Sequence, residues 1–576
     1  MYAHYGVPGV LTLPLNFVQI PQVHSMTPML QLLPVGIGFL LASLSLAAPN
    51  ARDFVVYGFS QSDVDGEDPQ VYELEPDVTI RAIGKWSNNG SEVEDYNFAQ
   101  IGRYHAHNIT FMGSGTASVI FPQDFPNTEI FDAMSTQDAD GNIVPHGEFG
   151  FPTPARRGNL FNPAYRGYLL AWAKIQIDGG VDGVNFDEVN GGFSGGQKYS
   201  FNGNEGFDNF TLADFNRYLL EKYPNLTADD WKAKFKLAPN NLLSRDIPPS
   251  DLTRNFNYRT YLKESGWNLN PLNTSNPLAA EWGKVVSNRL YSEDMSFTAV
   301  YTRRYWKELI DNLRQYARQT QGREILISSN GLWPYVDFNS VGMYPWNPDE
   351  QTSDYRGADY VPILEGRLNG AKSLQRQYGY LKEQSRRIAG DDVPVAVFID
   401  WPNDMMTGYL NLPLEDKKNY WRIFGAEAYA NGLFPAFHLR DTVGSPTARD
   451  AGVLDFFRNY TAFYKRNRAL FRDNMREDTP VKFNAEGLYG TVLAQKGTAS
   501  RTVHIVNHVY ERGQVTPLTG VALVDFPVEK CPSRVDFVSP DLPVGDVRKS
   551  SFTCGNQKLR VKLEVMHHYG ILVLVD

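Results

Sequence analysis

Residues 179–190 read Gly-Gly-Val-Asp-Gly-Val-Asn-Phe-Asp-Glu-Val-Asn, and this stretch restricts the fold more than any other. Apolar residues within 164–175 recur at helical spacing just before it, and the paired glycines would end that helix. Val184–Phe186 then reads as a short buried strand that ends in two adjacent carboxylates, Asp187 and Glu188. A helix, a glycine stop and a strand tipped with acid form one unit of a parallel α/β fold. In a barrel of such units, catalytic groups lie at this end of the strands.

Seven other segments also read as short strands, separated by helical patterns or loops. Eight alternating units of this kind favour a (β/α)8 TIM barrel over an open, doubly wound sheet. Polar or aromatic residues follow most of these strands and would lie at the rim of the barrel. The strands and the residues that follow them are 78–84 with Trp86, 109–112 with Gly113, 324–329 with Asn330, 338–343 with Tyr344 and Trp346, 360–364 with Glu365, 393–399 with Asp400 and Trp401, and 433–437 with His438.

The rest of the chain divides around this pattern. We assign residues 52–475 to the barrel, including a long insertion at 191–300 in which helices begin near Thr211 and Thr227. Long segments after barrel strands usually shape the substrate cleft. Residues 476–576 contain seven short alternating strands, which predict a C-terminal antiparallel β-sandwich domain.

The sequence from Asn162 to Asp187 resembles the nucleophile strand of the α-amylase-like glycoside hydrolases. In that group an Asn-Pro helix start leads through a Gly-x-Asp-Gly turn to a strand that ends in Asp, and the turn stands here at 180–183. α-Amylases carry an Arg two positions before that Asp, where this chain has Asn185. The departure fits better the dextranase and cycloisomaltooligosaccharide glucanotransferase family, which lacks the Arg.

The resemblance also bears on the strand count. It implies that Asp187 ends the fourth strand of the barrel, whereas the strands counted above make it the third. Either Ala117–Phe121 or Phe54–Phe59 would supply the additional strand. A C-terminal β domain behind a barrel is also what the amylase-like and dextranase families show.

The resemblance implies a retaining, endo-acting enzyme that cleaves α-glucan. Retention needs two carboxyl groups about 5 Å apart, one attacking the anomeric carbon and one exchanging a proton. Asp187 is the predicted nucleophile by position and by resemblance. Glu365 is the predicted acid/base, because Tyr360 and Glu365 resemble the aromatic-plus-Glu strand of the dextranase family. The residues predicted to bind substrate are Glu188, Asp400, Asn330, Tyr344, Trp346, Trp401, Trp86 and His438, with Glu188 pointing away from Asp187.

Charge and composition restrict the partners. A formal net charge of −10 argues against nucleic acid, so the predicted partner is a polysaccharide or oligosaccharide. Two acidic fragments, Asp63–Asp68 and Asp138–Gly141, could hold calcium, but the pattern favours solvated turns. Neither fragment has the remaining ligands at a fixed spacing, so no cofactor and no catalytic metal are predicted.

The N-terminal region predicts export. Residues 1–51 include an apolar run after Met26 that ends in small residues near Ala47, which is the pattern of a signal peptide. No Lys or Arg precedes Arg52, and a single membrane anchor is the competing interpretation. A secreted, extracellular or periplasmic protein is therefore expected. Cys531 and Cys554 would then form one disulfide, or remain two buried thiols.

Several other functions remain as alternatives. Gly192–Gly196 matches the Gly-x-Ser-x-Gly elbow of serine hydrolases, but no helix pattern follows it directly, which argues against an esterase. A non-catalytic carbohydrate-binding protein on a barrel scaffold would not need two acids at cleft distance. An inverting glycosidase would hold its acids further apart. A polysaccharide lyase would need a cationic cleft, which the acidic chain disfavours.

Overall fold

The structure is a computed structural model of the 576-residue chain. All of the described residues lie in one compact unit, Ala48–Asp576. The structure describes residues 57–60, 76–82, 98–138, 140–145, 155–187, 189, 205–235, 257–264, 289–343, 370–389, 393–399, 412–438, 450–471, 474–495, 501–511, 514–563 and 565–575. The predicted signal or anchor segment lies outside these residues. No helix among them is both long enough and apolar enough to cross a membrane.

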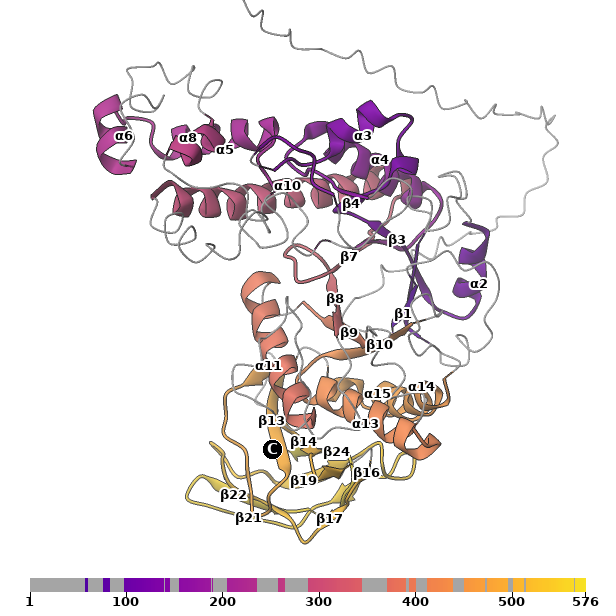
Figure 1. The fold of residues 1–576 in the computed structure, drawn as a ribbon. Coiled ribbons are helices and arrows are strands. Elements are labelled where there is room, and N and C mark those ends of the chain that lie inside the picture. The colour runs from indigo at the N-terminus through magenta and orange to yellow at the C-terminus, as the bar shows by residue number, and fades with distance from the viewer. Residues whose placement is uncertain are drawn as a thin grey trace, which may run out of the picture. The chain divides into compact units, whose positions relative to one another are not determined.

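A curled parallel sheet forms the first part of the described fold (Figure 1). Its strands pair in the order β1-β10-β9-β8-β7-β6-β3-β2, and β1 pairs with both β10 and β2. The predicted parallel α/β class is therefore confirmed. The strands are β1 (Tyr57–Ser60), β2 (Val78–Ala82), β3 (Thr110–Thr116), β6 (Gly183–Asp187), β7 (Leu326–Asn330), β8 (Phe338–Met343), β9 (Val395–Ile399) and β10 (Phe434–His438).

These pairings answer the open question of the strand count. Tyr57–Ser60 is the first strand, so Asp187 ends the fourth, as the resemblance implies. Val119–Ile120 (β4) also forms a strand, but it pairs with Arg156–Arg157 (β5) in a separate small sheet. The predicted strand at 360–364 lies outside the described residues, and β8 pairs directly with β9.

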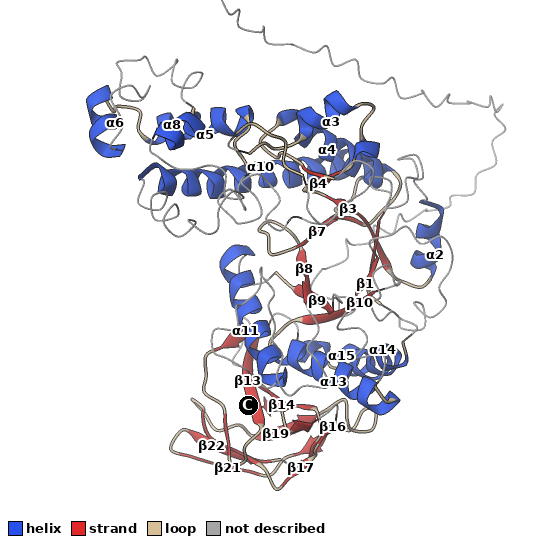
Figure 2. Cartoon of the chain, in the orientation of Figure 1, coloured by secondary structure: helices blue, strands red, loops and turns tan. Residues whose placement is uncertain are grey.

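Helices connect most neighbouring strands (Figure 2). The predicted helix before Asp187 and the predicted helix starts near Thr211 and Thr227 agree with the structure within a few residues. The prediction of regular βα alternation is wrong between β7 and β8, where residues 331–337 contain no helix. The described helices of this part are α2 (Ile101–Ala106), α3 (Thr128–Met134), α4 (Pro163–Asp178), α5 (Asn209–Lys222), α6 (Ala228–Phe235), α8 (Tyr258–Glu264), α10 (Arg289–Gln321), α11 (Gly370–Ala389) and α13 (Leu414–Ala430).

The short crossover between β7 and β8 contains no helix and is instead fixed by contacts with α10 and β8. The indole Nε1 of Trp306, on α10, donates to the carbonyl of Pro334 at 2.8 Å. The Trp306 ring also packs on Trp333, with centroids 5.5 Å apart. Asn339 of β8 accepts from the backbone N–H of Trp333 and donates to its carbonyl. Seven residues therefore suffice to return the chain to the start of the next parallel strand.

The unit before Asp187 shows why its sequence motif folds as it does. Asn162 caps α4 by accepting from the N–H of Ala164 at 2.9 Å, and its amide donates to the carbonyl of Ala133. Pro163 occupies the first helical turn, where its missing N–H costs nothing. At the other end, Gly180 adopts a φ of 98°, which favours glycine. The Asn-Pro start and the glycine stop are thus requirements of the helix.

The Asp of the Gly-x-Asp-Gly turn joins two strands at their N-terminal ends. The Asp182 carboxylate accepts from the N–H of Phe111 at 2.8 Å and contacts the His105 imidazole at 2.7 Å. A Cβ on Gly183 would lie 2.5 Å from the carbonyl oxygen of Leu326, so only glycine fits there. The turn therefore serves the packing of the sheet, at the edge opposite Asp187.

The described C-terminal part contains two larger antiparallel sheets that share one core, and two small two-stranded sheets, β15 (Tyr510–Glu511) with β16 (Gln514–Val515) and β17 (Leu518–Thr519) with β23 (Val565–Met566). Side chains of both larger sheets, among them Val503, Leu523 and Leu572, belong to the same buried apolar cluster. All seven strands predicted here form. One sheet contains β11 (Asn474–Glu477), β13 (Leu488–Gln495), β14 (Arg501–Asn507), β24 (Tyr569–Val575), β19 (Arg534–Val538) and β20 (Arg548–Lys549); the other contains β12 (Lys482–Phe483), β18 (Ala522–Pro527), β22 (Lys558–Lys562) and β21 (Phe552–Gly555).

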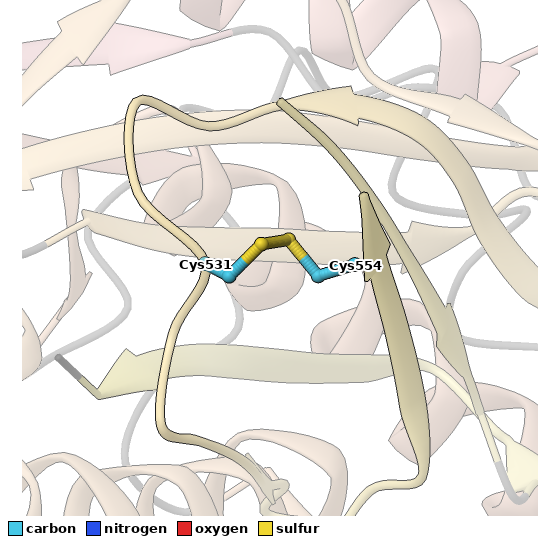
Figure 3. Close-up of a disulfide and its surroundings, with 2 residues drawn as sticks. All are labelled: Cys531 and Cys554. Carbon is cyan, nitrogen blue, oxygen red and sulfur yellow. A yellow bond between two sulfur atoms is a disulfide. The ribbon is translucent and has the colours of Figure 1, made fainter. Parts of the chain in front are cut away.

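A disulfide ties part of this region together. Cys531 lies between β18 and β19, Cys554 lies on β21, and the two Cα atoms are 5.8 Å apart (Figure 3). Of the two states considered for these cysteines, the structure has the disulfide.

The helix α13 joins the two parts of the fold. Its Glu427 carboxylate contacts the His508 imidazole, which follows β14, and both side chains are buried. Asn419, also on α13, contacts His568 at 3.0 Å just before β24. The predicted closing helix follows as α14 (Ala451–Phe456), a π-helical turn η6 (Phe457–Thr461) and α15 (Ala462–Arg466).

Candidate active site

Three of the predicted site residues lie within the described residues. Asp187 ends β6 and Asn330 ends β7, and these strands are hydrogen-bonded neighbours. His438 ends β10 at the same edge of the sheet, because the strands are parallel. The other predicted residues lie outside the described residues, namely Glu188, Glu365, Asp400, Tyr344, Trp346, Trp401 and Trp86.

Asp187 is a nearly buried carboxylate at the C-terminal end of the fourth strand. Its side chain is 4% exposed. Its backbone carbonyl accepts from the N–H of Ala117 at 2.7 Å, which fixes the strand end against the residues that follow β3. Its Oδ1 accepts from Nδ2 of Asn330 at 2.7 Å. Sequence analysis placed both residues at the rim, and the structure brings them into direct contact.

Small polar side chains form a hydrogen-bonded layer one step below Asp187. Nδ2 of Asn185 donates to Oγ of Ser114 at 2.9 Å, and Oδ1 of Asn185 accepts from Oγ of Ser328 at 2.7 Å. All three side chains are buried. At the position where α-amylases carry Arg, this chain therefore has a neutral side chain, Asn185, which donates one hydrogen bond and accepts another within the sheet.

The alternation of β6 explains why these residues share one side of the sheet. Phe186 packs against Trp172 of α4 and Trp306 of α10, so its side chain faces the helices. Asn185 and Asp187 alternate with Phe186 and therefore face the interior. Sequence analysis missed Ser114 and Ser328 as members of the interior layer. Ser328 lies on the predicted strand 324–329, but Ser114 follows the predicted strand 109–112, which ended too early because β3 extends to Thr116.

The insertion at 191–300 contributes helices that pack against α4 and α10 through aromatic and acidic side chains. Tyr305 of α10 donates to the carboxylate of Asp214 on α5, and the Arg166 guanidinium lies 3.8 Å from the centroid of the Tyr305 ring. Burial raises the pKa of Asp214 above its ordinary value, although the hydrogen bond from Tyr305 opposes that shift. These contacts hold the described part of the insertion to the sheet-covering helices.

The acidic fragment at Asp138 forms a closed turn. Its Oδ1 accepts from the N–H groups of Asp140 and Asn142, both at 2.8 Å, and its Oδ2 accepts from the Asn142 amide. Within the described part of the chain, no cluster of three metal-binding side chains occurs. The other fragment, Asp63–Asp68, lies outside the described residues.

Comparison with known proteins gives matches at the level of structure. No protein-family model matches the sequence, and no curated protein matches it. A cycloisomaltooligosaccharide glucanotransferase from Paenibacillus sp., solved with cycloisomaltoheptaose, superposes with a TM-score of 0.51 at 10% identity. The match covers 91% of this chain and 85% of that one. A maltogenic α-amylase from Thermotoga neapolitana matches with a TM-score of 0.47 at 11% identity, over 92% of this chain and 100% of that one.

At such low identity the match to the glucanotransferase concerns the fold alone. The resemblance of this chain to the cycloisomaltooligosaccharide glucanotransferase fold, which the sequence pattern predicts, is thereby confirmed.

Proposed function

We propose that this protein is a retaining glycoside hydrolase acting on a neutral polysaccharide or oligosaccharide, with α-linked glucan as the substrate class. Its scaffold would be a complete (β/α)8 barrel over residues 52–475, followed by a β-sandwich at 476–576. Asp187 would attack the anomeric carbon, and Glu365 would first protonate the leaving oxygen and then deprotonate water.

The observation that carries the proposal is the placement of Asp187. A carboxylate that is 4% exposed at the C-terminal end of a parallel strand loses most of its hydration, which is unfavourable unless the charge is used or well paired. Asn330 supplies a neutral donor, which orients the carboxylate without neutralising it. An oriented, nearly buried carboxylate at this edge suits nucleophilic attack on a sugar.

The position of Glu365 in the chain agrees with its proposed role. It lies in the segment between β8 and α11, which leaves the sheet from the edge where Asp187 lies, because β8 is parallel to β6. Asp400 follows β9 and His438 ends β10 at that same edge. The remaining rim residues, Glu188, Tyr344, Trp346, Trp401 and Trp86, are proposed to contact the sugar.

The substrate class rests on the fold comparison and on charge. The structure with a TM-score of 0.51 is named as a glucanotransferase and holds a cyclic isomaltooligosaccharide, which favours an α-glucan here. Transfer to a second sugar instead of water would use the same two carboxyl groups. The mechanism needs no cofactor.

We also propose that the protein is secreted. The N-terminal pattern suits a signal peptide, and the disulfide between Cys531 and Cys554 suits an oxidising compartment.

The test is to measure reducing ends released from a panel of α- and β-glucans and other neutral polysaccharides. Asp187→Asn and Glu365→Gln should each lose at least about a thousandfold in kcat on the polymer that wild type cuts, because each removes one half of the carboxyl pair. Asp182→Asn is the matched control, since Asp182 lies on the same motif at the opposite edge of the sheet. It should lower the melting temperature but keep kcat below that temperature.

Four results would contradict the proposal in different ways. Activity that survives both substitutions would refute the assigned acids. Inversion of the anomeric configuration, detected by NMR of the first product, would favour an inverting glycosidase. Binding of a sugar without cleavage of any polymer would favour the carbohydrate-binding alternative, and an unsaturated product would indicate a polysaccharide lyase.

A further inference from the structure

The two amide atoms of Asn330 have different surroundings. Nδ2 donates to Oδ1 of Asp187 at 2.7 Å. A carboxylate can only accept, so the amide nitrogen is the atom that faces Asp187. Oδ1 of Asn330 is buried and has no hydrogen-bond partner among the residues that the structure describes. Since a buried acceptor without a partner is costly, it favours a ligand that brings a donor.

The ligand expected at Asp187 carries such donors. In the proposed reaction a sugar ring lies against Asp187, with its anomeric carbon within reach of the carboxylate. Asn330 is on the adjacent strand and touches that same carboxylate, so its free oxygen lies beside the same ring. A ring hydroxyl can donate to that oxygen while Asp187 attacks.

We propose that Asn330 joins the nucleophile to the substrate: Nδ2 orients Asp187, and Oδ1 accepts a hydrogen bond from a hydroxyl of the sugar ring under attack. The inference rests on the proposed glycosidase function and deepens it. The layer below agrees with the arrangement, because the Asn185 amide is engaged with Ser114 and Ser328, whereas the Asn330 amide nitrogen faces Asp187.

The first test compares pH profiles of kcat/KM on the polymer that wild type cuts. Asn330→Ala removes the hydrogen-bond donor to Asp187, so Asp187 should be protonated more readily. The acidic limb of the kcat/KM profile should therefore move to higher pH, and kcat should fall by about tenfold to a hundredfold. Asn330→Asp replaces the donor by a second carboxylate and should move that limb further. Ser329→Ala is the matched control, because the Oγ of Ser329 donates to Asn339 and does not contact Asp187.

The second test uses the shortest oligosaccharide that wild type cuts, together with its monodeoxy derivatives on the attacked ring. Wild type should cleave one derivative about tenfold or more slowly, since it lacks the hydroxyl that donates to Asn330. Asn330→Ala should cleave that derivative and the parent sugar at similar rates.

The outcomes separate this inference from the proposed function. If wild type cuts the polymer and Asp187→Asn does not, but Asn330→Ala keeps the acidic limb and the discrimination between derivatives, the role of Asn330 is refuted and the glycosidase function stands. If wild type cuts no sugar, both are refuted. A shift in Ser329→Ala equal to that in Asn330→Ala would show a general effect of β7 and would also refute the proposal.

Discussion

At the scale of single residues, the motif at 180–187 contains two carboxylates with different surroundings. Asp182 and Asp187 are five positions apart, yet one accepts from the N–H of Phe111 and the other faces Asn330. The strand β6 places them at opposite edges of the sheet. The sequence motif contains both, and the structure shows that Asp182 joins the starts of two strands whereas Asp187 lies at the opposite edge beside Asn330.

Gly183 gives a prediction at this scale. Gly183→Ala should lower the free energy of unfolding by about 2 kcal/mol, because the new Cβ meets the backbone of Leu326, which cannot move without disturbing β7. Differential scanning calorimetry checks the stability. Gly167→Ala is the control, since no atom lies within 4 Å of its added Cβ on α4. It should stabilise the protein by about 0.5–1 kcal/mol. Equal effects of the two substitutions would contradict the packing argument.

At the scale of elements, the strands of the two parts depend on different restraints. The parallel strands are short and are fixed by buried helices on one side and by interior side chains on the other. Among the C-terminal strands, β22 alternates between exposed and buried residues, with Leu559 and Val561 buried, whereas β14 is buried along nearly its whole length. A small sheet such as β12-β18-β22-β21 has little core of its own, so the disulfide adds a restraint that burial alone does not provide.

The disulfide can be tested directly. Replacing Cys531 and Cys554 by Ser should lower the free energy of unfolding by about 3 kcal/mol, the chain-entropy effect expected for their separation of 23 residues. Thermal unfolding of wild type with and without reductant should show the same loss. The double Ser variant is the control, because reductant should leave its melting temperature unchanged. An unchanged melting temperature in reduced wild type would contradict the prediction.

At the scale of the whole molecule, a few buried polar contacts connect the parallel sheet to the C-terminal sheets. Asp541 accepts from the N–H groups of His568 and Tyr569 and lies 3.6 Å from the His568 imidazole. The hydroxyl of Tyr460, on η6, donates to it at 3.5 Å. Burial by itself would raise the pKa of Asp541, but His568 and these backbone N–H groups outweigh burial and hold the pKa below its ordinary value.

This depressed pKa predicts how stability depends on pH. A carboxyl group whose folded pKa is lowered stabilises the protein above the unfolded value of about 4, and that contribution is lost as the pH falls through the folded pKa. Chemical unfolding measured from about pH 7 down to pH 3 should therefore show a loss of stability at the acidic end. Asp541→Asn should be less stable at neutral pH and less sensitive to acid.

Asp229→Asn serves as the control for the pH dependence, because Asp229 is exposed on α6. Its stability should follow that of wild type at every pH. An Asp541→Asn curve parallel to that of wild type would show that Asp541 does not contribute to the acid sensitivity.

The sequence by itself determined the elements whose signals are local. The cap at Asn162, the glycine stop, the strand ending in Asp187 and the alternating C-terminal strands each follow from the preferences of neighbouring residues. These signals also predicted the parallel α/β class and the position of Asp187 at the C-terminal end of its strand. They could not decide between Phe54–Phe59 and Ala117–Phe121, because both are short apolar runs and only pairing distinguishes them.

Only the tertiary structure decided which side chains meet. Asn330 contacts Asp187 across 143 positions of sequence, and Ser328 contacts Asn185 across the same separation. The crossover between β7 and β8 likewise depends on Trp306 of α10, which lies 28 positions before its hydrogen-bond partner Pro334. The register of two parallel strands is set by the packing of the whole sheet, so it cannot be predicted from a local sequence pattern. That register places Asn330 beside Asp187.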